Sequence, residues 1–175
     1  MAQDTKKSSV IGTDTRKVAY AVVLVAIGVV LAPYTSFPIG IAKVNPTQHF
    51  VNVIGAILLG PWWATIIAAV IGIIRNVMGV GTLLAFPGGM IGAFLAGYFY
   101  RWARHVYAGA GGEVIGTGFI APVVSALFVA PVFMGKAIPL LALVPSFLAS
   151  TVAGAILGVL AVKMLHRAGV VTLGD

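Results

Sequence analysis

Long runs without a charged residue are the feature that most limits what this chain can fold into. One run extends from Val18 to Ala42 and another from Val44 to Ile74. A helix needs about 20 apolar residues to cross the bilayer core, and each run is long enough. Hydrophobic residues make up 60% of the 175 residues and charged residues only 9%, against about 25% charged residues in soluble domains. The sequence therefore predicts an all-α integral membrane protein.

Turn signals divide the chain into six predicted transmembrane helices. Gly60 and Pro61 lie near the middle of the second run, and because proline fits the first turn of a new helix, we split this run into two short spans. The six expected spans are approximately 18–34, 47–59, 62–77, 87–100, 119–134 and 139–162. Fusing the second and third spans gives five, which is the alternative topology. The glycine-rich segment 108–118 is interpreted as a flexible linker, since no lysine follows its glycines as in a phosphate-binding loop.

The basic residues favour six spans with both termini in the cytoplasm. The inner segments would then carry eight of them: Lys6, Lys7, Arg16, Lys17, Arg101, Arg104, Lys163 and Arg167. The outer side would hold Lys43, Arg75 and Lys136. This distribution follows the positive-inside rule, whereas five spans would place Arg101 and Arg104 outside.

The same topology predicts how the chain is organised. A cytoplasmic tail is expected over residues 1–17, a six-helix membrane domain over 18–167 and a C-terminal tail over 168–175. A basic region before an apolar run is also typical of a signal peptide, but the first run exceeds the 7–15 residues of a signal core.

Composition and motifs argue against several functions. The net charge of +7 would indicate nucleic-acid binding in a soluble protein, but the charge-free runs leave no room for a basic face. The chain has no cysteine, and no metal site and no cofactor are expected. The acidic residues are all expected outside the spans, which argues against a proton relay built on buried carboxylates; they are Asp4, Asp14, Glu113 and Asp175.

Motifs give no support to an enzyme. A pair formed by His49 and a serine is formally left open, but no local motif supports a nucleophile, so no catalytic residue is assigned. The chain also lacks a nucleotide-binding motif. If the protein moves a solute at the expense of ATP, another subunit must hydrolyse the ATP.

Polar residues around the first predicted loop form the candidate site, with the segment 34–52 as its lid and rim. Polar side chains on a helix that enters a bilayer are costly, and their default interpretation is functional. Gln48 and Asn52 share one helix face at a spacing of four. The predicted substrate site consists of Lys43, Asn45, Gln48, His49, Asn52, Arg75, Asn76 and Phe86. Such a set suits a small, planar, mostly neutral heterocycle. Alternatively, Lys43 and Arg75 only mark helix ends and extend to the interface.

Small residues recur four positions apart in several predicted helices, as in Gly88, Gly92 and Ala96. Such ridges let membrane helices approach closely, and most are expected to pack inside the bundle. Gly28 and Ala32 in the first span are the candidate surface for docking a partner membrane protein.

Two consecutive segments, AKVNPTQHFVNVIGAILLGPWWA and IRNVMGVGTLLAFPGGMIGAFLAG, resemble the ThiW family. Its members are substrate-binding S components of energy-coupling factor (ECF) transporters, linked to uptake of the thiazole precursor of thiamine. The matching residues are Lys43, Pro46, Gln48, His49, Asn52, Gly60, Pro61, Trp62, Arg75, Asn76, Gly81, Thr82, Phe86, Pro87, Gly88 and Gly92. The resemblance is sharp over residues 38–101 and looser elsewhere.

This resemblance implies a six-helix S-component fold in a prokaryotic cell membrane and hydroxyethylthiazole, or a close relative, as substrate. It also implies partners: a transmembrane coupling protein and two cytoplasmic ATPases, whose ATP hydrolysis would tilt the S component and release its load inside. S components usually carry an AxxxA docking motif in the first span, where this chain keeps the spacing only at Gly28 and Ala32.

Other functions stay open beside this one. The chain would alternatively be a stand-alone secondary transporter of a small heterocycle, or an assembly subunit of a membrane complex that binds no small molecule. The sequence also does not separate the thiazole from thiamine, from its pyrimidine half or from another vitamin-like heterocycle.

Overall fold

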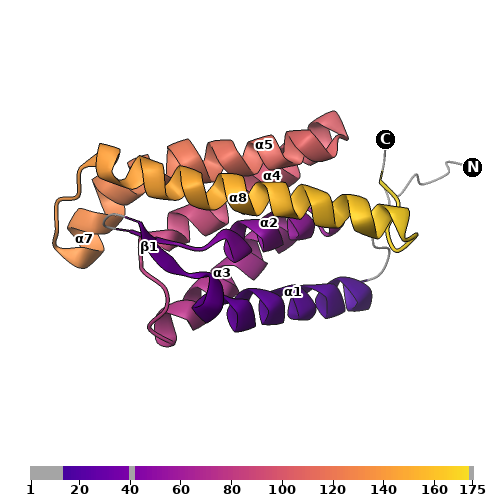
Figure 1. The fold of residues 1–175 in the computed structure, drawn as a ribbon, viewed down its shortest axis with the longest axis horizontal. Coiled ribbons are helices and arrows are strands. Elements are labelled where there is room, and N and C mark those ends of the chain that lie inside the picture. Colours follow the sequence, from indigo (N-terminus) through magenta and orange to yellow (C-terminus); the bar gives the residue numbers. More distant parts are fainter. Residues whose placement is uncertain (1–13, 40–41, 174–175) are drawn as a thin grey trace, which may run out of the picture.

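The structure is a computed structural model, and it describes residues 14–39 and 42–173. Within these residues, six helical segments run back and forth, so that the start of the first and the end of the last lie at the same end of the molecule (Figure 1). The first four helices are α1 (Asp14–Thr35), α2 (Pro46–Leu58), α3 (Pro61–Val77) and α4 (Ala85–Ala103). A hairpin of β1 (Phe37–Ile39) and β2 (Ala42–Val44) separates α1 from α2.

The last two segments are the longest. The fifth runs from Val106 to Met134 and consists of α5 (Val106–Ile115), η1 (Gly116–Ile120), α6 (Ala121–Val124), η2 (Ser125–Val129) and α7 (Ala130–Met134). The sixth is α8 (Leu140–Arg167). Among the described helices, α1, the fifth segment and α8 are long and apolar enough to cross a membrane. This agrees with the predicted all-α membrane protein, while the six crossings and the side of the termini stay predictions.

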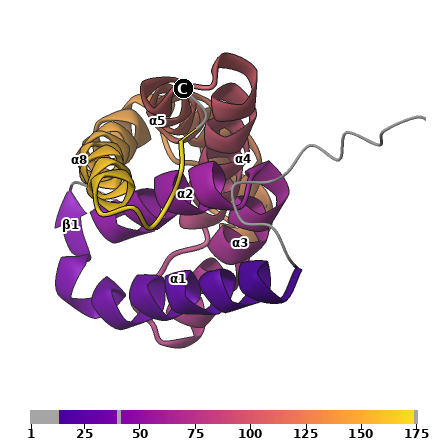
Figure 2. The same ribbon diagram turned by 90° about the vertical axis from the view of Figure 1, so that its right-hand side faces the viewer.

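The helix at the centre of the bundle, α2, is the shortest of the six segments. It has 13 residues, all buried except Pro46 and Phe50, and Figure 2 shows it surrounded by the other helices. At 1.5 Å per residue it is about 20 Å long, which is less than the about 30 Å of a bilayer core. It is separated from α3 at Gly60, and Pro61 is the first residue of α3, as the position of this proline predicted.

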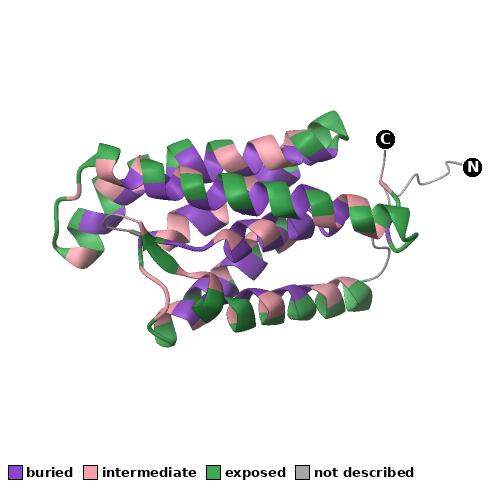
Figure 3. Cartoon of the chain, viewed as in Figure 1, coloured by how far each residue is buried: buried purple, intermediate pink, exposed green. Residues whose placement is uncertain are grey.

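Apolar side chains cover the outward faces of the peripheral helices. Val22 and Val30 of α1, Phe128 of η2 and Leu157 of α8 are each more than half exposed. Figure 3 shows the buried residues on the inward faces and the exposed ones on the outer surface. An apolar outer surface of this extent is unusual in a soluble monomer, and it fits a bilayer.

The segment 108–118 is helical, so its interpretation as a flexible linker is wrong. Its glycines instead let α5 pack against α4. A Cβ added at Gly112 would lie 2.7 Å from the carbonyl carbon of Leu95, and one added at Gly116 would lie 2.8 Å from the Cα of Gly92. Glycine permits such close approach of two membrane helices. The fifth segment therefore begins at Val106 rather than near residue 119.

Two stretches of the fifth segment, η1 and η2, have π-helical geometry. Each ends shortly before a proline, Pro122 after η1 and Pro131 after η2. Proline lacks the backbone N–H, and its ring clashes with the carbonyl four residues earlier in an α-helix. We attribute the wider turns to these two prolines.

The hairpin was not predicted, and it is fastened to α8. Phe37 pairs with Val44 in its antiparallel register. The Ser146 hydroxyl donates to the carbonyl of Ile39 at 2.7 Å, and the backbone N–H of Asn45 donates to Ser150 Oγ at 2.9 Å. These two bonds hold the hairpin over one end of the bundle.

The predicted tails are described only in part. Residues 1–13 of the N-terminal tail and 174–175 of the C-terminal tail lie outside the described residues. Residues 14–17 form the first turn of α1 rather than a tail. After α8, Val171 is buried, and its carbonyl oxygen lies 3.0 Å from Nδ1 of His166.

Candidate functional site

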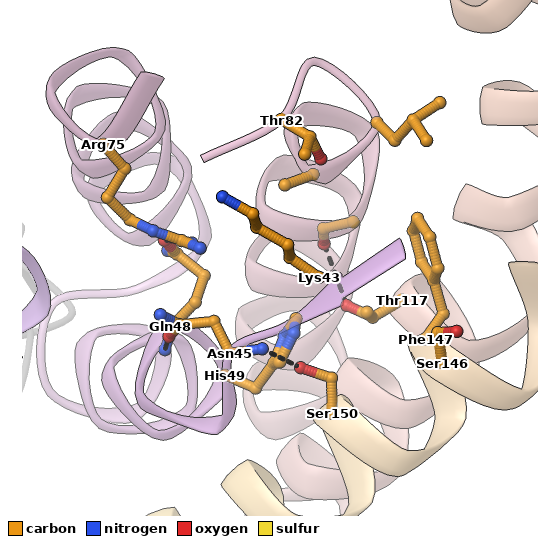
Figure 4. A pocket seen from close by; sticks show the side chains of 13 residues that line it. Lys43, Asn45, Gln48, His49, Arg75, Thr82, Thr117, Ser146, Phe147 and Ser150 are labelled. Carbon is orange, nitrogen blue, oxygen red and sulfur yellow. Dashed lines mark hydrogen bonds between the residues drawn. The ribbon is translucent and has the colours of Figure 1, made fainter. Parts of the chain in front are cut away.

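A polar cavity lies where the hairpin, α2, α3, α4, η1 and α8 meet, beneath the hairpin and away from the end where α1 begins (Figures 1 and 4). Most of the residues that line it have polar side chains, in contrast to the apolar rest of the bundle. The lining residues are Lys43, Asn45, Gln48, His49, Arg75, Thr82, Leu84, Ala85, Gly88, Thr117, Ser146, Phe147 and Ser150.

The cavity is contracted around these side chains. Its free volume is about 30 Å³, which is room for about one or two water molecules. Pockets that hold small organic ligands are usually about 300 Å³ or larger. A ligand of more than a few atoms therefore enters only if part of the lining moves.

The start of α2 positions one side of the cavity. Asn45 is the N-cap of α2, and its side-chain oxygen accepts a hydrogen bond from the backbone N–H of Gln48 at 2.8 Å. Pro46 follows as the first residue of the helix. Asparagine before proline is a favoured helix start. The Asn45 amide also donates to Ser36 Oγ at 2.6 Å. Asn45 thus holds the first loop to α2 and places Gln48 and His49 at the cavity.

A hydrogen-bonded chain runs from α3 into the centre of the bundle. Arg75 Nη1 donates to Gln48 Oε1 at 3.4 Å, and Gln48 Nε2 donates to Asn52 Oδ1 at 3.1 Å. Asn52 Nδ2 donates in turn to the carbonyl of Gly89 at 3.0 Å and to Glu113 Oε1 at 3.1 Å. The spacing of four between Gln48 and Asn52 predicted that they share a face, and they are also bonded to each other.

Glu113 lies at the inner end of this chain and is completely buried. His49 Nδ1 lies 2.7 Å from Glu113 Oε1, within hydrogen-bonding distance. The Thr117 hydroxyl lies 2.9 Å from the same oxygen and 2.8 Å from the carbonyl of Gly88. Glu113 Oε2 has no hydrogen-bond partner among the described residues. Of this pair, His49 lines the cavity, and Glu113 lies behind it in the bundle.

The prediction that Glu113 lies outside the spans is wrong, because α5 begins seven residues before it and carries it two turns into the bundle. Gly92 of α4 leaves the space, since a Cβ there would lie 2.7 Å from Glu113 Oε1. A helical interpretation of the glycine-rich segment would have indicated that Glu113 and Thr117 share a face at a spacing of four. The sequence argument against buried carboxylates loses its premise.

Five of the eight predicted site residues line the cavity: Lys43, Asn45, Gln48, His49 and Arg75. The other three lie outside the lining. Asn52 is buried below it, bonded to Gln48. Asn76 donates to the carbonyl of Gly72 at 2.8 Å, and the Phe86 ring lies 3.1 Å from where a Cβ of Gly72 would be.

Several lining residues were not predicted to bind substrate, and most come from α4, η1 and α8. They are Thr82, Leu84, Ala85, Gly88, Thr117, Ser146, Phe147 and Ser150. The spacing of four between Ser146 and Ser150 within an apolar helix was the available signal. Both hydroxyls bond to the backbone around the hairpin. The recorded side-chain partner of His49 within the described residues is Glu113, so the serine–histidine pair considered from the sequence has no support here.

Gly28 and Ala32, the predicted docking residues, lie inside the bundle. A Cβ at Gly28 would collide with the side chain of Ile71 in α3, and Ala32 has no exposed surface. Gly28 therefore serves the packing of α1 against α3, and Ala32 is buried one turn further along α1. The pair does not offer a surface that a partner subunit reaches.

Comparison with known proteins gives one match. A family model described as thiamine-precursor transporter protein (ThiW) matches residues 18–168. No curated protein and no solved structure matches the chain.

Proposed function

The chain belongs to the ThiW family of thiamine-precursor transporter proteins, which confirms the resemblance, and from this membership we propose that it is the substrate-binding S component of an ECF importer. Family membership and the apolar helices indicate a membrane protein of thiamine-precursor transport. We propose in addition the S-component role, the coupling to ATP hydrolysis and the identity of the substrate.

The observation that carries the proposal is the polar cavity at one end of an apolar bundle. Its lining offers hydrogen-bonding groups from Gln48, His49 and Thr117, and Phe147 supplies an aromatic wall. A few convergent polar groups with an aromatic neighbour are typical of small-molecule sites. We propose hydroxyethylthiazole, or a close relative, as the ligand, with hydrogen bonds from Gln48 and His49.

The distribution of basic residues supports uptake from outside. Arg101 lies next to Gly60 at the turn between α2 and α3, and the Lys163 ammonium bonds to the Tyr107 hydroxyl near the start of α5. Arg101 lies near the end of α4 and Lys163 near the end of α8, and both helices end where α1 begins (Figure 1). Under the positive-inside rule that end is cytoplasmic, so the cavity would open to the exterior.

Energy coupling would need other subunits. The sequence carries no phosphate-binding loop, so in this proposal two cytoplasmic ATPases and a transmembrane coupling protein supply the ATP hydrolysis. The docking surface is left open, because Gly28 and Ala32 are buried within the chain.

The test is binding by the purified full chain in detergent, without ATP or partners. Equilibrium dialysis would compare radiolabelled hydroxyethylthiazole with thiamine, the aminopyrimidine precursor, riboflavin and biotin. Tight and selective binding of a thiamine precursor is the expected result. Absence of binding to any of them by a folded sample would refute the proposed solute-binding role and favour an assembly subunit.

The buried Glu113–His49 pair supports a second candidate, a proton-coupled secondary transporter. Carboxylate and imidazole groups inside a membrane often form proton relays, and the His49 side of this pair lines the cavity. The two candidates differ in whether the chain transports its substrate without other subunits. Uptake by the chain alone in proteoliposomes, driven by a pH gradient, would favour the secondary transporter, whereas uptake that needs ATPase subunits would favour the S component.

A further inference from the structure

Arg75 is a buried cation whose donors are nearly all unused. Its residue surface is 3% exposed, and Nε has no hydrogen-bond partner among the described residues. Its one recorded bond is from Nη1 to Gln48 Oε1 at 3.4 Å, although a guanidinium carries five N–H donors. Arg75 also lines the cavity, and Figure 4 shows its guanidinium directed toward the space beside Lys43 and Gln48.

The described residues give this cation no carboxylate partner. The ion pairs recorded there join Lys17 to Asp14 and His49 to Glu113. Glu113 is connected to Arg75 only through two intervening amides, and it is not part of the lining. Buried charges in proteins are normally paired, because an unpaired one forfeits its hydration without compensation.

The position of Arg75 at a helix end does not account for these free donors. It lies in the last turn of α3, where carbonyl dipoles favour a cation, yet no bond from Arg75 to a carbonyl is recorded in the described part. Its burial also excludes the alternative that it extends to the membrane interface. Lys43 differs, since it is exposed and donates to the carbonyl of Gly79 at 3.3 Å.

Two cations from different elements thus flank a cavity whose lining holds no acidic side chain. Arg75 approaches from α3, and Lys43 approaches from β2 in the hairpin. The amides, hydroxyls and imidazole around them carry no negative charge, so they balance neither cation. The sequence alone suggested a mostly neutral ligand, because it did not indicate that Arg75 is buried without a partner.

We propose that this cavity recognises an anionic group, a carboxylate or a phosphate, carried by the ligand. The planar guanidinium of Arg75 binds it, because its fork of parallel N–H donors matches two oxygens of such a group. Lys43 adds a second positive charge from the hairpin. The inference rests on the proposed function and names the substrate class: an acidic derivative of the thiamine precursor rather than the neutral alcohol.

The experiment compares three ligands that share one thiazole ring: hydroxyethylthiazole, its phosphate monoester, and the analogue in which a carboxymethyl group replaces the hydroxyethyl group. Calorimetric titration of the purified full chain at one pH and one ionic strength gives the three dissociation constants. At least one anion should bind about tenfold or more tightly than the alcohol, as hydrogen bonds to charged groups are worth more than neutral ones. The anion whose affinity exceeds that of the alcohol shows whether the cavity recognises a carboxylate or a phosphate.

The variants assign the effect to the residues. Arg75→Gln should weaken binding of the tighter-binding anion about tenfold or more and change binding of the alcohol about threefold at most. Arg75→Lys should recover part of the lost anion affinity. Lys43→Gln, on the exposed hairpin, should act in the same direction. Lys136→Gln is the matched control, because it removes one positive charge from an exposed residue outside the cavity.

The outcomes separate this inference from the proposed function. If the alcohol binds at least as tightly as both anions, or if the charge-removing variants at both cavity positions leave anion binding unchanged, the inference is overturned while the S component stands. If none of the three ligands, and no pyrimidine precursor, binds to folded protein, both are overturned. Should Arg75→Gln fail to fold, the inference is tested by the ratio of the alcohol and anion dissociation constants of the wild type and by the anion affinity of Lys43→Gln.

Discussion

Glu113 places a carboxyl group in the centre of the bundle, and several neighbouring side chains bond to it. Its Oε1 has three polar neighbours within 3.1 Å, contributed by His49, Asn52 and Thr117. Removing one member of a buried pair leaves the other groups without partners, which typically costs about 3–5 kcal/mol. At the scale of a residue, Glu113 is therefore expected to matter more for stability than any exposed acid.

We predict that Glu113→Ala lowers the free energy of unfolding by about 3–5 kcal/mol, and that Glu113→Gln lowers it less because the amide keeps one acceptor. Chemical unfolding in detergent, followed by circular dichroism, measures the change. Asp14→Asn is the control, since the Asp14 side chain is 98% exposed. Equal stability of Glu113→Ala and the wild type would contradict the role assigned to the buried pair.

Gln48 and Asn52 differ in what they touch, although we expect both to affect binding. Gln48 lines the cavity, whereas Asn52 acts through Gln48 and Glu113. Gln48→Ala should weaken ligand binding about 5- to 150-fold, the loss of a buried hydrogen bond. Asn52→Ala should weaken it as well and also lower the melting temperature. Lys136→Ala should leave affinity unchanged, and unchanged affinity in both amide variants would remove the proposed site.

Which site residues were predictable depended on their surroundings in the sequence. Gln48 and His49 were recognisable because they are polar residues at the start of an apolar helix. Glu113 was missed because its glycines also suit a linker, and only the contact with α4 distinguishes the two interpretations. Asn76 and Phe86 looked equally functional, but a local turn and a packing contact account for them.

At the scale of the element, two neighbouring glycines of α5 give a matched pair. A Cβ at Gly112 would lie 2.7 Å from the Leu95 carbonyl carbon, whereas a Cβ at Gly111 would have nothing within 4 Å. We expect Gly112→Ala to destabilise by about 1–3 kcal/mol through overpacking. Gly111→Ala should be neutral or stabilising, because alanine is the better helix former by about 1 kcal/mol. Thermal unfolding of both variants in one detergent is the measurement, and equal melting temperatures would contradict the packing of α5 on α4.

Element boundaries could be predicted where charges, prolines and glycines gave unambiguous signals. The break between α2 and α3 follows from Gly60 and Pro61, and the starts of α4 and α8 differ from expectation by two residues or fewer. The hairpin could not be predicted, since three residues per strand, one of them Pro38, carry no alternation of polar and apolar positions. Its pairing depends on contacts with α8 that are distant in the sequence.

At the scale of the whole molecule, the six-segment arrangement assigns each loop to one end of the bundle. The loop after α4 lies at the end where α1 begins, and the loop between α7 and α8 lies at the opposite end (Figure 1). Arg104 belongs to the first of these loops and Lys136 to the second. Both residues are exposed. A five-span topology would exchange the two sides for both loops, so these positions distinguish the alternatives.

The chain contains no cysteine, so single substitutions report on sidedness without background. We predict that, in intact cells, a membrane-impermeant maleimide labels the Lys136→Cys variant, whereas it labels Arg104→Cys only after the membrane is permeabilised. The physical reason is the excess of Lys and Arg on the α4–α5 side, which retains that side in the cytoplasm. The reverse labelling pattern would support five spans and would place the mouth of the cavity in the cytoplasm, where it would serve export or assembly rather than uptake.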